Sequence, residues 1–276
     1  MSQRLLVCCL NVQEARNSQV IDKLKKVCSG QLVQSFIDPL FNRSNLTICG
    51  ESDDIYKVVE KLSDVALEHI NMNNPARLAD KTMHHHIGVL DLIPVHPLAN
   101  TTLEDAGELA VRISESLNSK EVPTLLYGSA DLPRSRSLVQ VRKQTSFFQR
   151  GQNSCGDAVS GHPTMGTSVV GATPYVLSFN MVINTTNIAD VAEAVLGLRS
   201  KEHGVQVMPY TNLFEKREVV EIACNLLKPG SPEGCQECIL NNTRVLMETC
   251  GLEVIHSYST NPPFESILEM YHNLVK

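Results

Sequence analysis

The chain contains 276 residues, of which 42% are apolar and 20% are charged, and its formal net charge is −6. This length suits one large domain or two domains of ordinary size. The acidic balance argues against a general nucleic-acid-binding protein, which would carry a clustered basic face. No segment approaches the roughly 20 apolar residues that span a bilayer. We therefore expect neither nucleic acid nor a membrane among the partners.

Nine scattered cysteines and the amino-terminal sequence bear on the compartment. The first apolar run is too short for a signal peptide and lacks a small-residue cleavage site. Scattered cysteines in a chain without secretory features are typical of a reduced, intracellular protein. These features predict a cytoplasmic location.

Apolar periodicity predicts alternating strands and helices in the first part of the chain. Short apolar runs predict strands at 4–11, 31–37, 43–49 and 84–95, the last bounded by Pro94 and Pro97. Helical spacing predicts a helix at 17–28, capped by Asn17 or Ser18, and one at 52–70, capped by Ser52. This order of elements is that of the ferredoxin-like βαββαβ arrangement.

The remaining elements complete a tandem architecture. Thr101 and Glu104 predict a capping box at the start of the next helix. A strand at 123–127 and a partly helical segment at 133–149 follow, and residues 151–171 have the composition of a long loop. The second half repeats the first, with strands at 174–183, 205–210, 219–227 and 252–255 and helices at 187–199, 233–251 and 264–275. We predict an α/β (α+β) fold of two ferredoxin-like subdomains, 1–172 and 173–276, with a ligand in the crevice between them.

Three consecutive histidines, His84, His85 and His86, precede the fourth predicted strand. One of them could act as an acid or base near neutral pH, because a partly desolvated imidazole titrates there. Two could share a face of a strand and bind zinc, but no third ligand stands at a recognisable spacing. The third interpretation is a set of solvated or hydrogen-bonded loop histidines. We favour the acid/base role and predict no metal.

Two further motifs give weaker evidence of a functional site. The segment 134–150 contains Arg134, Arg136, Arg142, Lys143 and Arg150 and no acidic residue. It is either a solvated helix face or a surface that attracts a small anion beside the Gly-rich loop. The pair Cys235 and Cys238 forms a lone CxxC motif, for which a structural role is the better interpretation.

Six collinear stretches resemble the formiminotransferase family, the amino-terminal half of formiminotransferase-cyclodeaminase. They are residues 9–20 (Cys-Leu-Asn-Val-Gln-Glu-Ala-Arg-Asn-Ser-Gln-Val), 42–50, 84–97, 123–130 (Pro-Thr-Leu-Leu-Tyr-Gly-Ser-Ala), 166–180 and 221–227. The resemblance covers most of the chain and is strongest to stand-alone formiminotransferase-like proteins of eukaryotes. It implies two ferredoxin-like subdomains, the second one shortened, with a ligand tunnel between them. We expect no cyclodeaminase portion.

The resemblance also implies a catalytic residue. The family's catalytic histidine stands in a His-Pro-Arg-Met/Leu-Gly motif, which reads His-His-His-Ile-Gly at residues 84–88 here. The catalytic histidine therefore corresponds to His84. The glycine of the motif and Asp91 are retained, whereas His85 and His86 replace the family's proline and arginine.

Further residues for substrate and folate binding follow from the same resemblance. The aspartate before the family's Asn-Arg pair corresponds to Asp38, and the pair itself to Asn42 and Arg43. The folate-contacting loop corresponds to residues 157–166, where Met165 replaces a tryptophan of the family. The implied binding residues are Asp38, Asn42, Arg43, Asp91, Asp157, Ala158, Val159, Ser160, Gly161, His162, Pro163, Thr164, Met165 and Gly166.

The reaction that the resemblance implies is transfer of a formimino group from N-formimino-glutamate to N5 of tetrahydrofolate, the expected co-substrate. His84 would be the acid/base, Asp38 and Asp91 would orient the reacting groups, and the basic segment would attract the glutamate tail. A homodimer is a further family expectation. The alternative is a protein that keeps the fold and binds folate without transfer, which the replacements at 85, 86 and 165 motivate.

Overall fold

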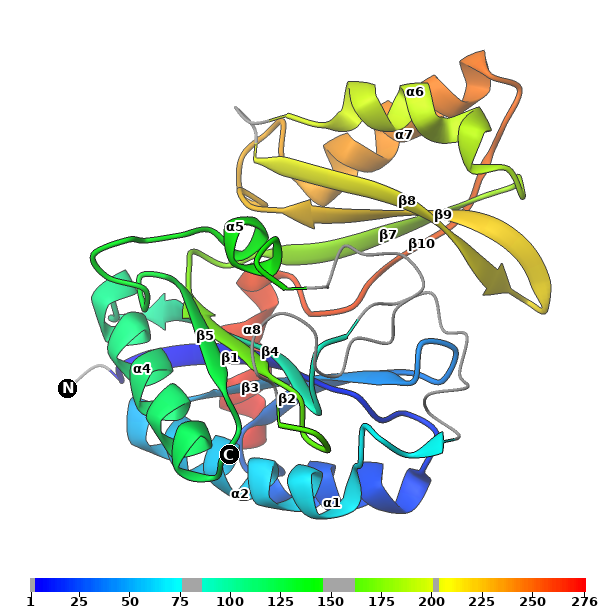
Figure 1. Ribbon diagram of the computed structural model, residues 1–276. Helices are drawn as coiled ribbons and strands as arrows, with labels where there is room; N and C mark the ends of the chain where they lie inside the picture. The colour runs from blue at the N-terminus through cyan, green and yellow to red at the C-terminus, as the bar shows by residue number, and fades with distance from the viewer. Residues whose placement is uncertain (1–2, 76–85, 146–161, 201–203) are drawn as a thin grey trace. The chain divides into compact units, whose positions relative to one another are not determined.

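The computed structural model describes residues 3–75, 86–145, 162–200 and 204–276 (Figure 1). The chain forms two compact units. Unit 1 consists of residues 1–174 and 265–276, and unit 2 consists of residues 175–264. Each unit builds its own β-sheet, with six strands in unit 1 and four in unit 2. No helix in these described ranges is long and apolar enough to cross a membrane.

Unit 1 begins with a βαββαβ motif and then extends it. Its elements are β1 (Leu5–Val12), α1 (Ser18–Val27), β2 (Leu32–Asp38), β3 (Arg43–Gly50), α2 (Ser52–His69), β4 (Leu90–Ala99), α4 (Leu103–Ser119), β5 (Thr124–Gly128), α5 (Leu138–Arg142), β6 (Ser168–Ala172) and α8 (Phe264–Leu274). The strand order is β2-β3-β1-β4-β6-β5. The first four strands are antiparallel, as in a ferredoxin-like sheet, and β6 pairs in parallel with both β4 and β5.

One face of this sheet packs against helices to form the main core of unit 1. Alternate apolar residues of β1 and β3 meet the apolar stripes of α1, α2 and α4, as the period-2 and period-3.6 patterns require. Fully buried members of this core include Leu6, Leu10, Leu24, Ile48, Leu62 and Leu109. The opposite face carries a smaller apolar cluster that holds α5 and consists of Ile87, Tyr127, Val141 and Val169.

Two predicted helix caps shift by one residue. Thr102, not Thr101, caps α4 and forms its capping box with Asp105, because the Thr101 hydroxyl donates to the Leu5 carbonyl instead. Glu51 is the N-cap of α2, so Ser52 lies in the first turn. The predicted cap of α1 is confirmed, since the Asn17 side chain accepts from the Val20 amide.

In unit 1, one strand prediction is wrong in its bounds and one loop prediction is wrong. The fourth strand begins at Leu90 and continues through Pro94 and Pro97 to Ala99, whereas we predicted residues 84–95. Residues 84 and 85 lie outside the described ranges. The predicted loop at 151–171 contains strand β6, which is short, rich in small residues and buried along its whole length. Apolar periodicity misses such a strand because it has no exposed side to alternate with.

Unit 2 repeats the βαββαβ order. Its elements are β7 (Leu177–Ile183), α6 (Ile188–Leu198), β8 (Val205–Phe214), β9 (Arg217–Leu226), α7 (Gln236–Thr249) and β10 (Val254–Ser259), with the strand order β10-β7-β9-β8. Helices α6 and α7 cover one face of the antiparallel sheet (Figure 1). The predicted fold class, two α+β units in tandem, is therefore confirmed. The last helix, α8, returns to unit 1, where Ile267 is fully buried.

Candidate functional site

The sheet face of unit 1 that turns away from α1, α2 and α4 is polar. Residues paired across antiparallel strands share a face, and the register pairs Asp38 with Arg43 and Asn45 with Asn11. We call this surface the polar face, and its members on β1 to β4 are Cys9, Asn11, Asp38, Arg43, Asn45, Thr47 and Asp91. Strand pairing thus brings together three of the residues predicted to bind substrate, Asp38, Arg43 and Asp91.

Asp91 reaches this face because β4 contains a β-bulge. Asn11 pairs with Leu92 and Val12 pairs with Leu90, so Asp91 is the extra residue on β4. A bulge re-aims the inserted side chain. The Asp91 carboxylate is fully buried, and its Oδ1 accepts a hydrogen bond of 3.0 Å from the Ile87 amide.

Two arginines flank the other oxygen of Asp91. Oδ2 lies 3.4 Å from a terminal nitrogen of Arg43 and 3.5 Å from one of Arg142. The two arginine side chains are only 15% and 12% exposed. We call this set the ion cluster. Such a cluster can hold an anionic group or stabilise negative charge that develops in a reaction, because guanidinium binds carboxylate-like oxygens with a matching geometry.

Electrostatics in the ion cluster favour charged arginines next to a neutral phenol. Burial and, to a smaller extent, the nearby Arg43 lower the pKa of Arg142 to about 10, although Asp91 opposes the shift. Arg142 therefore stays protonated at neutral pH. Burial raises the pKa of Tyr127 well above its usual range, so this phenol stays neutral.

Helix α5 delivers Arg142 to the cluster. The Ser137 hydroxyl and the Gln140 side chain form a capping box at its start, and Val141 packs with Tyr127 in the smaller apolar cluster. With Val141 fixed, the next residue, Arg142, reaches the carboxylate of Asp91.

This arrangement corrects the prediction of one basic surface at 134–150. Asp131, just before the segment, pairs with Arg134 at 2.7 Å and with Arg136 at 2.6 Å. Hydrogen bonds from Arg136 hold the pKa of Asp131 down to about 2. Arg142 turns inward, Lys143 is exposed, and residue 150 lies outside the described ranges. The described arginines of the segment therefore have acidic partners within this chain.

The structure brings the segment after the histidine triplet against the predicted folate loop. The Thr167 amide donates to the Ile87 carbonyl at 2.8 Å, and the Val89 amide donates to the Met165 carbonyl at 2.9 Å. Between these bonds Gly88 bridges to Gly166. Both glycines are required by close backbone approach, since a Cβ at Gly88 would lie 2.3 Å from the Thr167 carbonyl oxygen.

Asp38 and Asn42 shape the hairpin that leads into Arg43. The Asp38 carboxylate accepts from the amides of Leu40 and Phe41 at 3.0 and 3.1 Å. Asn42 has a left-handed backbone with φ +49°, and its Oδ1 accepts from the Ala15 amide at 2.9 Å. Both contacts are local hydrogen bonds that asparagine and aspartate favour in turns.

Several predicted residues lie outside the described ranges. They are His84, His85 and residues 157–161. Of the rest of the predicted loop, the residues from 162 to 166 form a tight turn, with His162 and Gly166 bonded to each other through both backbone groups. Within the described ranges no three His, Cys, Asp or Glu side chains are placed to hold a metal, and this leaves the histidine triplet untested.

Sequence reasoning missed the roles of Tyr127, Asn11 and Asn45. Asn45 donates to Asn11 at 3.2 Å across the centre of the polar face. A polar residue inside an otherwise apolar run was the available signal, because alternation puts that residue on the face opposite the core.

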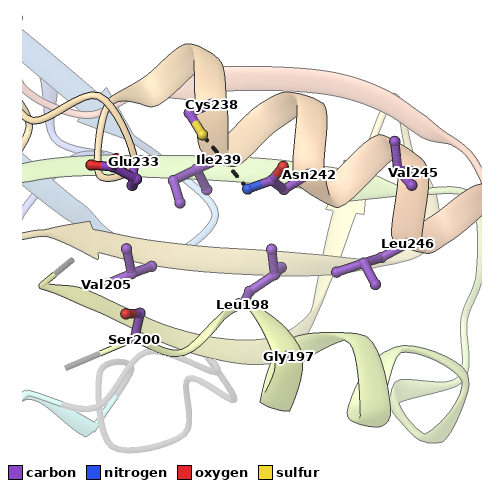
Figure 2. A pocket seen from close by; sticks show the side chains of 10 residues that line it. All are labelled: Gly197, Leu198, Ser200, Val205, Glu233, Cys238, Ile239, Asn242, Val245 and Leu246. Atoms are coloured by element: carbon purple, nitrogen blue, oxygen red, sulfur yellow. Dashed lines mark hydrogen bonds between the residues drawn. The ribbon is translucent and has the colours of Figure 1, made fainter. Parts of the chain in front are cut away.

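A cavity of about 430 Å³ lies elsewhere, between α6 and α7 of unit 2 (Figure 2). Its lining is largely apolar and consists of Gly197, Leu198, Ser200, Val205, Glu233, Cys238, Ile239, Asn242, Val245 and Leu246. None of these residues was predicted to bind substrate. Cys238 points into the lining and accepts a weak contact from Asn242 at 3.6 Å, whereas the Cys235 sulfur caps α7.

Comparison with known proteins decides the family. The formiminotransferase domain, N-terminal subdomain, matches residues 5–173, more than half of the chain. The chain belongs to the formiminotransferase family. All described residues of the polar face and the ion cluster fall within this match, so they are part of the formiminotransferase domain.

Three formiminotransferase relatives illustrate the range of similarity. A protein of Arabidopsis thaliana named formiminotransferase cyclodeaminase-like protein is 24% identical over all of this chain and 99% of its own length. Glutamate formimidoyltransferase of Streptococcus pyogenes serotype M1 is 26% identical over 81% of this chain and 78% of its own length. The mouse formimidoyltransferase-cyclodeaminase is 26% identical over 82% of this chain, which spans 44% of the mouse protein.

Proposed function

We propose that this protein transfers the formimino group of N-formimino-glutamate to N5 of tetrahydrofolate. Its family and the names of its relatives support this reaction. The observation that carries the proposal is the buried carboxylate of Asp91, which holds the Ile87 amide on one oxygen and two guanidinium groups on the other. Asp91 thereby couples the segment that follows His84 to a charged site on the polar face.

The reaction needs a proton shuttle and electrostatic support for its tetrahedral intermediate. N5 of tetrahydrofolate attacks the formimino carbon to give a tetrahedral intermediate, and the bond from that carbon to the glutamate nitrogen then breaks. His84 takes the proton from N5 and gives it to the departing nitrogen, as acid/base catalysis requires. Asp38, Asn42, Arg43, Asp91 and the loop 157–166 form the binding surface in this proposal, and tetrahydrofolate is the co-substrate.

We further propose a subdomain organisation, a cellular location and an oligomeric state. Residues 1–172 and 173–276 correspond to the amino- and carboxyl-terminal subdomains of the family, the second one shortened. The protein acts in the cytoplasm on soluble substrates, and two copies form a homodimer.

Replacing His84 by alanine tests the catalytic assignment. We expect the transfer rate to fall at least about 100-fold, the size of an acid/base contribution, while calorimetric binding of tetrahydrofolate stays unchanged. His272→Ala, which removes an exposed histidine of α8, serves as the control with unchanged rate. Full activity of His84→Ala would remove His84 from the mechanism.

A second candidate function is folate binding without transfer. Met165 favours it, because its side chain packs against the core of unit 1 and offers no aromatic ring to a ligand. In that case calorimetric titration would show saturable binding of tetrahydrofolate, with no formimino product at high protein concentration. Tighter binding of the polyglutamate form, weakened by charge reversal at Arg142 and Lys143, would locate its tail at these basic residues.

A further inference from the structure

A pair of cysteines opens helix α7 of unit 2. Cys235 is the N-cap residue, with an extended backbone, and its sulfur accepts from the Cys238 amide at 3.4 Å. Cys238 lies in the first turn of α7, which follows β9 after a loop of residues 227–235. A CxxC pair at the start of a helix in a βαβ unit is the arrangement found in disulfide oxidoreductases. The structure thus supplies a context that the sequence motif alone lacked.

The two cysteines are close enough to form a disulfide. Positions three apart on an α-helix have Cα atoms about 5 Å apart, as the helical rise and radius require. Disulfides span Cα separations of about 4.4–6.8 Å. A bond between the N-cap residue Cys235 and Cys238 therefore requires side-chain rotation and little movement of the backbone.

Room for that rotation comes from the cavity between α6 and α7. Cys238 lines this cavity, and its sulfur lies 3.6 Å from Asn242 Nδ2, one turn further along α7 (Figure 2). The Cys235 sulfur lies 3.3 Å from the Pro232 carbonyl oxygen. Both contacts are weak, because sulfur is a weak donor and a weak acceptor. Since Asn242 and Cys235 lie on opposite sides of Cys238 along the helix, closing the bond withdraws the Cys238 sulfur from Asn242 and changes the lining of the cavity.

The other described cysteines have different surroundings. Five of them are buried: Cys8, Cys9, Cys28, Cys49 and Cys224. Burial raises the pKa of the Cys28 thiol to about 11 and the pKa of the Cys49 and Cys224 thiols to about 12, and a protonated thiol is a poor nucleophile. Cys250 is exposed but lies at the opposite end of α7. In the described part of the chain, only the CxxC pair is both adjacent and accessible to a small reagent.

We propose that Cys235 and Cys238 form a redox-active dithiol, which closes to an intramolecular disulfide by exchange with a small-molecule disulfide. One cysteine, as its thiolate, attacks a sulfur of the small disulfide, forms a mixed disulfide and releases one small thiol. The thiolate of the other cysteine attacks the protein sulfur of the mixed disulfide and releases the second small thiol. The protein loses two electrons and two protons, and the small disulfide takes them up as two thiols. An excess of small thiol reverses both steps, and the exchange is independent of formimino transfer.

Oxidation in glutathione buffers tests the pair. The reduced full chain is incubated with rising concentrations of glutathione disulfide at a fixed concentration of glutathione. Free thiols are then alkylated, and tryptic peptides are analysed by mass spectrometry, since Arg244 separates the pair from Cys250. Because the second step is intramolecular, we expect half oxidation of the pair at a glutathione disulfide concentration at least about tenfold below the one that half modifies Cys250.

Serine variants provide the controls. Cys250→Ser should leave oxidation of the pair unchanged. Cys235→Ser, which keeps a favourable N-cap residue, and Cys238→Ser should each abolish the internal bond. The remaining thiol should then gain a glutathionyl group at about the concentration that modifies Cys250. A wild-type pair that stays reduced while Cys250 is modified, or that gains glutathionyl groups without losing two hydrogen atoms to an internal bond, would overturn the inference.

Discussion

Both units bury a carboxylate on the sheet face opposite their main helix layer, α1, α2 and α4 in unit 1 and α6 and α7 in unit 2, but they surround it differently. Asp91 of unit 1 lies between two guanidinium groups and a backbone amide, whereas Glu221 of unit 2 receives only neutral amide and phenol donors. The first arrangement is locked by opposite charges in a low-dielectric setting. The second is held by hydrogen bonds from four neutral side chains within one sheet.

This difference separates a carboxylate that joins several chain segments from one that is held within a single sheet. Asp91 contacts three chain segments at once, so moving it would displace β3, α5 and the segment after His84 together. Glu221 contacts only side chains of its own sheet. Substitution of Asp91 should therefore affect stability and turnover together, and substitution of Glu221 should disturb the sheet of unit 2 alone.

Charge reversal at Arg142 should have the largest effect. Arg142→Glu would place two carboxylates in one buried site beside a single arginine, and removing one member of a buried pair alone costs about 3–5 kcal/mol. We expect a loss above about 5 kcal/mol, comparable to the total stability of many domains. Lys143→Glu, on the exposed neighbour, should change the free energy of unfolding by less than about 0.5 kcal/mol. Denaturant titration of both variants measures this contrast.

Matched amide substitutions compare the two carboxylates directly. Asp91→Asn leaves two buried guanidinium groups without their anion, for an expected loss of about 3–5 kcal/mol. Glu221→Gln keeps most of its hydrogen bonds and relieves a buried charge, so we expect a loss of no more than about 1–2 kcal/mol. Equal losses, measured as the free energy of unfolding, would contradict the distinction between the two sites.

Acid should weaken unit 1 through a buried histidine. His96 is 2% exposed and its Nδ1 lies 2.9 Å from the Thr173 carbonyl, and burial lowers its pKa from 6.5 to about 4. Between those values the unfolded chain takes up a proton that the folded chain does not. The contribution of neutral His96 to the free energy of unfolding is therefore at its full value above pH 6.5. It falls as the pH drops toward 4, by about 3 kcal/mol in all. His96→Gln should flatten this part of the stability curve, and an unchanged slope would exclude His96 as its cause.

The βαββαβ order of both units could be predicted from the sequence because their strands and helices have clear apolar periods. Asn17 and Asn187, with side chains that accept N-terminal amides, marked two helix starts correctly. Strand β6 could not be found this way, because it is buried along its whole length and starts in a Gly-rich stretch. The capping prediction at Thr101 was wrong because its hydroxyl donates a hydrogen bond to the Leu5 carbonyl of β1. Such a tertiary contact cannot be read from the local sequence pattern.

The candidate site in unit 1 could also be predicted only in part from the sequence. Asp38, Arg43 and Asp91 came from the resemblance, and strand register places them on one face. The pairing of Arg142 with Asp91 was not predictable, since the two residues are 51 positions apart in sequence and meet only through the bulge in β4 and the packing of α5. Spacing also gave no hint that Asp131, outside the basic segment, neutralises two of its arginines.

The most direct test measures formimino transfer from N-formimino-L-glutamate to tetrahydrofolate in the wild type, Gly88→Ala and Gly30→Ala. A Cβ at Gly88 would collide with the Thr167 backbone and displace the segment that carries His84, whereas Gly30 has no neighbour within 4 Å. We predict full rates for the wild type and Gly30→Ala and a loss of about 100-fold for Gly88→Ala, the size expected of a misplacement near 1 Å. No product from a folded wild type, or equal rates in all three proteins, would contradict the account.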